Sequence, residues 1–138
     1  MKGKTMNKGR LLKTAEIVER VAKEKPELFS MNDWKNETEC GSVCCAVGWA
    51  ARDKELMEQG LSLESCGENS HNVLYHNPQT KIVGWGMQAS MYFYQLSLAD
   101  ASYLFNPHHY ERSQISDAKY VANRIRKFVE DGGRPVDS

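Results

Sequence analysis

Residues 43–51 read Val-Cys-Cys-Ala-Val-Gly-Trp-Ala-Ala, which is the longest apolar run in the 138-residue chain. A helix that is apolar on all sides is usually buried on most of them, so this run predicts a helix in the core of the protein. The hydroxyl of Ser42 is placed to cap that helix and Gly60 to end it, which predicts one helix from about 42 to 58. The run is far shorter than the roughly 20 apolar residues of a membrane span, and we expect no membrane partner.

Amphipathic patterns on both sides of this run predict further helices around the same core. Apolar residues recur at helical spacing before Pro26, and a second clear stripe ends at Gly132. Ser97 is followed three residues later by an acidic side chain, the spacing of an N-terminal cap. With the central helix, the expected helices cover about residues 8–24, 42–58, 87–95, 97–105 and 117–131.

Two short runs rich in β-branched and aromatic residues lie at 72–76 and 81–85. The residues between them, Asn-Pro-Gln-Thr, are typical of a turn, so the segment predicts a β-hairpin. The length suits one domain. We therefore expect an α+β protein, mostly helical, with about five helices around one core, a small β-hairpin near residues 72–85 and a single domain over residues 1–138.

Charge is balanced overall, with 18 basic and 18 acidic residues, but residues 1–25 hold eight basic side chains against three acidic ones. We interpret residues 1–7 as a flexible basic start to the chain. A basic excess confined to one end is the usual pattern of a solvated helix, so nucleic acid is not an expected partner. The first ten residues lack the apolar stretch of a signal peptide, which predicts a soluble protein in the cytoplasm of a bacterial cell.

The four cysteines, Cys40, Cys44, Cys45 and Cys66, allow three interpretations. In the first they are thiols in a reducing compartment that serve as small buried hydrophobic residues. In the second, Cys40 lies just before a helix, where the helix dipole lowers the pKa of a thiol. His71 or His76 would then supply the base of a Cys40-dependent hydrolase, with His108 or His109 as further candidates.

The third interpretation is a zinc site. Cys40, Cys44, Cys66 and His71 offer thiolate and imidazole ligands, the donors that zinc prefers. Structural zinc sites are usually built from closely spaced pairs in turns, whereas Cys44 lies in a run that predicts a helix. The structural interpretation is therefore our first expectation, with no metal, no cofactor and no catalytic residue.

Aromatic side chains gather in the second half of the chain. If residues 87–95 are helical, the aromatic residues around them cannot all face one core, so part of this set is expected on the surface. Such a surface suits a protein partner, or a small nucleotide whose base stacks on an aromatic ring. The candidate binding residues are Trp85, Gln88, Tyr92, Tyr94 and Tyr110.

The segment around the apolar run resembles a motif of small phage and bacterial proteins. In that motif a phenylalanine, a methionine and a tryptophan precede Cys-Gly-Thr-x-Ala-Cys-x-Ala-Gly-Trp-Ala. Here Ser42 replaces the threonine, and Cys44 and Val47 replace alanines. The resemblance extends loosely over residues 28–131. The residues that agree are Phe29, Met31, Trp34, Cys40, Gly41, Cys45, Gly48, Trp49 and Ala50.

This resemblance implies a fold and a phage or bacterial setting, and it brings no chemistry to transfer. We therefore expect a small soluble non-enzymatic binding protein, encoded by a phage, that inhibits or sequesters a host factor in counter-defence or host takeover. The alternatives are a protein that sequesters a small nucleotide, a Cys40-dependent hydrolase and a zinc-binding protein.

Overall fold

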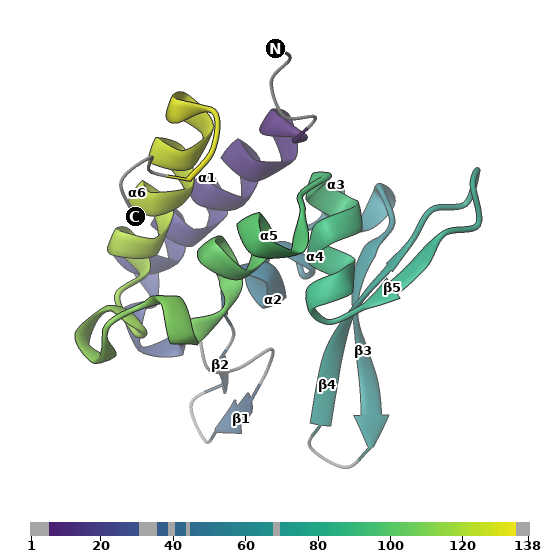
Figure 1. Ribbon diagram of the computed structural model, residues 1–138. Coiled ribbons are helices and arrows are strands. Elements are labelled where there is room, and N and C mark those ends of the chain that lie inside the picture. Colours follow the sequence, from purple (N-terminus) through teal and green to yellow (C-terminus); the bar gives the residue numbers. More distant parts are fainter. Residues whose placement is uncertain (1–5, 31–35, 39–40, 44, 68–69, 135–138) are drawn as a thin grey trace.

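The structure is a computed structural model that describes residues 6–30, 36–38, 41–43, 45–67 and 70–134. Within these residues, six α-helices accompany a three-stranded and a two-stranded antiparallel sheet. This arrangement confirms the mostly helical α+β class predicted from the sequence. Figure 1 shows α4 and α5 between the pair α1 and α6 and the three-stranded sheet.

The first helix, α1 (Lys8–Glu24), has the bounds that its periodicity predicted. Asn7 caps it, because its Oδ1 accepts a hydrogen bond from the Arg10 amide at 3.0 Å. Residues 1–5 of the predicted flexible start lie outside the described residues, whereas Met6 is buried in the core. The face of α1 that is buried consists of Leu11, Thr14, Ala15, Ile17, Val18 and Val21.

The last helix, α6 (Ala118–Asp131), confirms the predicted closing helix and packs along α1 in the largest contact between two helices. Its apolar stripe is buried against α1, and Gly132 ends it in the left-handed conformation with a φ of 76°. Arg126 on α6 also donates to the Glu19 carboxylate on α1 at 2.6 Å. Both partners are partly exposed, so packing and not this ion pair carries most of the stability.

The prediction of one helix from about 42 to 58 is wrong. Residues 41–43 form strand β2 (Gly41–Val43), which pairs with β1 (Asn36–Thr38). Two short helices follow, α2 (Ala46–Ala50) and α3 (Lys54–Glu58), and their caps Cys45 and Asp53 both have extended backbones. The Asp53 carboxylate accepts from the Leu56 amide at 3.2 Å, so its side chain competes with the continuation of a helix.

The structure confirms that the described part of this apolar segment is buried. Around α2, the residues Cys45, Ala46, Val47, Ala50 and Ala51 are all buried. Trp49 is partly buried and its indole Nε1 donates to the Leu28 carbonyl at 3.0 Å. Phe29, the first residue of the resembling motif, is buried in the core, whereas Met31 and Trp34 lie outside the described residues.

The three-stranded sheet has the order β3 (Leu61–Gly67), β4 (Ser70–His76) and β5 (Val83–Trp85). The pair β4 and β5 confirms the predicted hairpin. Strand β3 was not predicted, although its first four residues alternate between apolar and polar as a strand does.

Two helices connect the sheet to the rest of the core. They are α4 (Met87–Tyr94) and α5 (Leu98–Phe105), and the oxygen of Ser97 caps α5 as predicted. Short 3₁₀ helices follow Lys25 and α5, and their bounds are Pro26–Leu28, Pro107–His109 and Arg112–Gln114. No helix in the described part of the chain is both long and apolar enough to cross a membrane.

Two buried hydroxyl groups provide a matched test of this core. Ser90 on α4 is fully buried, and its hydroxyl bonds to no described residue. Thr14 donates to the Arg10 carbonyl at 2.9 Å and accepts from the Tyr94 hydroxyl at 2.6 Å. Removal of an unpaired buried hydroxyl removes a desolvation cost, so we expect Ser90→Ala to raise the free energy of unfolding by up to about 1 kcal/mol.

Thr14→Val is the control, and we expect it to lower the free energy of unfolding by about 1–3 kcal/mol, because it leaves the Tyr94 hydroxyl without an acceptor. Urea denaturation followed by circular dichroism measures both variants. A loss of stability in Ser90→Ala as large as that in Thr14→Val would contradict the description of Ser90.

Candidate functional site

The pairing of β4 with β5 sorts their side chains onto two faces of the sheet. Successive side chains of a strand point to opposite faces, so the pair Tyr75 and Gly84 lies on one face and its neighbours on the other. Tyr75 and Gly84 are buried, whereas Val83 and Trp85 are exposed. The pairs on the exposed face are Leu74 with Trp85 and His76 with Val83.

Helix α4 covers the buried face at very close range. A Cβ atom on Gly84 would lie 2.8 Å from Cδ2 of Tyr92 and 3.1 Å from the carbonyl carbon of Gln88. A residue with a side chain does not fit there without a shift of α4. On the same face Tyr75 meets Phe93 edge to face, with ring centroids 5.5 Å apart. Gly84 therefore sets the distance between β5 and α4.

Large apolar side chains remain exposed around this contact. Seven such side chains are exposed in the described residues, and four of them fall between positions 82 and 92. The other three, on α1, α3 and α5, are scattered, which is ordinary for a protein surface. The group of four consists of Ile82 at 45% exposure, Val83 at 47%, Trp85 at 46% and Tyr92 at 37%, and is called the β5 surface below.

The β5 surface includes an open strand edge. In the described part of the chain β5 pairs only with β4, which makes it the edge of the sheet. The Ile82 carbonyl accepts from Asn77 at 2.9 Å, and the Gly86 amide donates to Val73 at 2.9 Å. Backbone groups alternate in direction along an antiparallel strand, so the N–H and C=O groups of Val83 and Trp85 point away from β4. They are available to another strand.

The structure brings together three of the five predicted binding residues. Trp85, Gln88 and Tyr92 are exposed, and Gln88 and Tyr92 approach β5 at Gly84. Ile82 and Val83 were not among the predicted binding residues. The sequence did contain a signal for Val83. Side chains alternate along a strand, so Val83 lies on the same face as Trp85, and Gly84 lies on the opposite face.

Tyr94 and Tyr110 are not part of this surface, which corrects the prediction that grouped them with it. Tyr94 lies two positions after Tyr92, about 200° around the helix, and faces the core with no exposure. It stacks on Phe105 with centroids 5.2 Å apart, and burial raises the pKa of its hydroxyl above the usual range of a phenol. Tyr110 is only 7% exposed, and burial likewise raises its pKa.

Tyr110 belongs to a cluster of aromatic rings around Arg124. The Arg124 guanidinium lies 3.9 Å from the ring centroid of Tyr110 and 4.5 Å from that of Tyr103. It donates to the carbonyls of Tyr103 and His109 at 3.0 and 2.9 Å, and to the Tyr120 hydroxyl at 3.1 Å. The chain's own arginine fills this aromatic cage, so its role is to join α6 to the segment after α5.

The thiol and zinc hypotheses rest on residues that the structure describes only in part. Cys40 and Cys44 lie outside the described residues. Cys66 lies on strand β3 and His71 on strand β4, and the register of the two strands pairs His71 with Ser65. His76 is exposed at the end of β4, opposite Val83. Among the described residues no three His, Cys, Asp or Glu side chains are grouped to hold a metal ion, and both hypotheses remain predictions.

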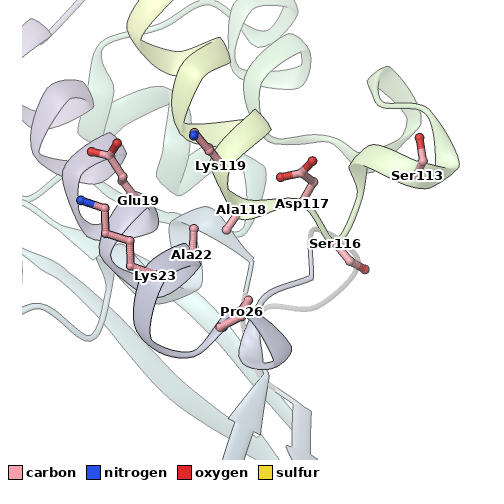
Figure 2. A pocket seen from close by; sticks show the side chains of 9 residues that line it. All are labelled: Glu19, Ala22, Lys23, Pro26, Ser113, Ser116, Asp117, Ala118 and Lys119. Atoms are coloured by element: carbon pink, nitrogen blue, oxygen red, sulfur yellow. The ribbon is translucent and has the colours of Figure 1, made fainter.

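A cavity of about 410 Å³ lies elsewhere, between α1 and the start of α6. Its acidic groups are engaged, Glu19 by Arg126 and Asp117 by the Tyr120 amide at 3.1 Å. Figure 2 shows the hydroxyls of Ser113 and Ser116 spread along the loop instead of converging on one point. This cavity has no convergent set of reactive groups and is not our candidate site.

Fold and surface together define a small, mostly helical α+β protein with an apolar, unpaired sheet edge. Comparison with protein-family models, with curated proteins and with solved structures found no match.

The close contact at Gly84 predicts a specific sensitivity. We expect Gly84→Ala to lower the free energy of unfolding by about 1–3 kcal/mol, because the added methyl group forces α4 away from β5. Gly9→Ala is the matched control on α1, where the nearest atom to the new Cβ would be Asn7 Oδ1 at 3.7 Å. We expect it to leave stability unchanged or to raise it by up to about 1 kcal/mol. Thermal unfolding measures both, and equal effects would contradict the geometry at Gly84.

Proposed function

We propose that the protein is a non-enzymatic binding protein that docks a protein partner on the β5 surface. The observation that carries this proposal is the position of Val83 and Trp85. Both expose about half of their apolar side chains, and both present unpaired backbone groups along the same edge. Soluble proteins usually protect such edges, so an apolar open edge marks a place where another chain pairs.

The mode of binding follows from the same two residues. An extended segment of the partner adds a strand next to β5 and bonds to the N–H and C=O groups of Val83 and Trp85. Its side chains contact Val83 and Trp85 on one face of the sheet and Tyr92 on the other. Main-chain bonds supply the register, and the aromatic rings supply most of the affinity, since Trp and Tyr are enriched among residues that dominate binding energy.

For the biological role, we propose that this partner is a host factor that the protein inhibits or sequesters in the cytoplasm of a bacterial cell, as part of phage counter-defence or host takeover. The support for this setting is the resemblance of residues 29–50 to small phage and bacterial proteins. Strand addition suits such a role, because it needs only a short extended segment of the target and no catalytic group on this chain.

The double variant Val83→Ser/Trp85→Ser tests the docking surface. We expect the wild-type chain to capture a partner from a bacterial lysate, and the double variant to bind the purified partner about a hundredfold more weakly. Isothermal titration calorimetry measures the affinity. Both side chains are half-exposed, so the variant should keep the fold of the wild type, which its far-UV circular dichroism spectrum checks.

The matched control removes apolar surface of similar exposure from other elements. Leu98 on α5 is 57% exposed and Met57 on α3 is 49% exposed. We expect Leu98→Ser and Met57→Ser to bind the partner with unchanged affinity. Retained binding in the Val83 and Trp85 variant, or an equal loss in the controls, would contradict docking at β5, and failure to capture any partner would contradict the binding function.

A further inference from the structure

A cavity of about 430 Å³ opens where the first turn of α1, the β4–β5 hairpin and the end of α4 meet. This volume lies within the range of roughly 300–1,000 Å³ that is common for small-molecule sites. The proposed docking of a protein assigns no role to the cavity. Its lining consists of Asn7, Arg10, Tyr75, Asn77, Thr80, Ile82, Met91, Tyr92 and Gln95.

Among the described residues that line the cavity, Arg10 is the one charged side chain, and none of them is acidic. The rest of the fold holds it in place. Its Nε donates to Gln59 Oε1 at 2.7 Å, and its Nη1 donates to the Phe93 carbonyl at 2.9 Å. Its guanidinium carbon lies 4.3 Å from the centroid of the Phe93 ring. Nη2 donates to no described residue, so a fixed cation keeps donor capacity beside the cavity.

Two further polar groups of the lining are donors without acceptors. Tyr75 is only 4% exposed, and its hydroxyl accepts from Asn77 Nδ2 at 3.0 Å but donates to no described residue. Asn7 uses its Oδ1 to cap α1, while its Nδ2 donates to no described residue. With Arg10, these donors make the lining complementary to an anion, and the positive end of α1 adds to the same field.

Another part of the lining is apolar and aromatic. Ile82, Met91 and Tyr92 provide it, and Tyr92 is 37% exposed, so its ring can take a stacked partner. Gln95 is exposed at the rim, and its side-chain amide bonds to no described residue. An amide offers one acceptor and two donors, which suits the polar edge of a ring.

We propose that this cavity binds a small aromatic anion, with the anionic group on Arg10 and Tyr75 and the flat ring against Tyr92. A nucleoside monophosphate has this chemistry, since its phosphate is separated from a stacking base that has a polar edge. The site goes beyond the proposed protein docking, because Arg10, Tyr75 and Gln95 are outside the β5 surface, although Ile82 and Tyr92 belong to both.

Isothermal titration calorimetry on the full chain tests the ligand class with five probes: AMP, UMP, adenosine, inorganic phosphate and indole-3-acetate. We expect AMP or UMP to bind, and adenosine and phosphate to bind at least about tenfold more weakly, because each lacks one of the two parts. Tighter binding of indole-3-acetate than of the nucleotides would support the same class with a carboxylate as the anion. If neither the nucleotides nor indole-3-acetate binds, or if phosphate alone binds as tightly as AMP, the proposal is overturned.

Variants locate the site with the probe that binds best. We expect Arg10→Gln and Tyr75→Phe each to weaken it by about tenfold or more. Arg112→Gln and Tyr120→Phe remove the same groups away from the cavity and should leave the affinity unchanged. Circular dichroism shows whether Arg10→Gln folds. If it does not fold, the affinities of Tyr75→Phe and Gln95→Ala test the assignment to the cavity. Wild-type affinity in both would overturn the assignment.

One more variant separates this proposal from the docking of a protein. Val83→Ser/Trp85→Ser leaves Arg10, Tyr75 and Tyr92 intact, so we expect it to keep full affinity for the small anion. Loss of the anion in this variant would place binding at the β5 surface and overturn the assignment to the cavity. Conversely, anion binding that persists when no protein partner is captured would leave the cavity proposal standing alone.

Discussion

Phe93 and Tyr94, adjacent at the end of α4, hold the separate parts of this fold together. Both are fully buried, and their rings meet edge to face at 5.0 Å. Phe93 contacts Tyr75 of the sheet and takes the Arg10 guanidinium of α1 on its ring. Tyr94 stacks on Phe105 of α5 and bonds to Thr14 of α1. This pair of aromatic residues therefore joins the sheet, α5 and α1 to one another.

The two candidate sites are consequences of that attachment. Because Phe93 draws α4 onto the sheet, the helix comes so close to β5 that only glycine fits at position 84. Tyr92 is then left at the edge of the sheet, beside the exposed Val83 and Trp85. The same attachment brings the first turn of α1 to the hairpin, since the Asn7 amide donates to the Tyr94 carbonyl at 2.7 Å. The cavity at Arg10 lies at that junction.

The cysteine-rich motif has a structural role wherever the structure describes it. Cys45 caps α2, since its Sγ accepts from the Gly48 amide at 3.4 Å, and Gly48 itself is buried. Trp49 bonds through its indole to Leu28, and the Arg52 guanidinium lies 4.3 Å from its ring centroid. The thiol of Cys45 therefore serves as a small buried hydrogen-bond acceptor, a role that does not require it to be reactive. This interpretation supports the structural hypothesis at Cys45.

The sequence by itself determined the elements whose information is local. The bounds of α1, the cap of α5 at Ser97 and the glycine end of α6 follow from periodicity and capping within a few residues. It did not determine the break between α2 and α3, because an apolar run favours one continuous helix, whereas the Asp53 carboxylate accepts from the Leu56 amide and caps a new one. Only tertiary structure decided that Tyr94 is buried and Tyr92 exposed, since the pattern of α4 is aromatic on both sides and its neighbours are distant in sequence. Tertiary structure likewise decided the unpaired edge of β5 and the cavity at Arg10. Both features depend on which distant segments pack against each other, and the local sequence does not contain that information.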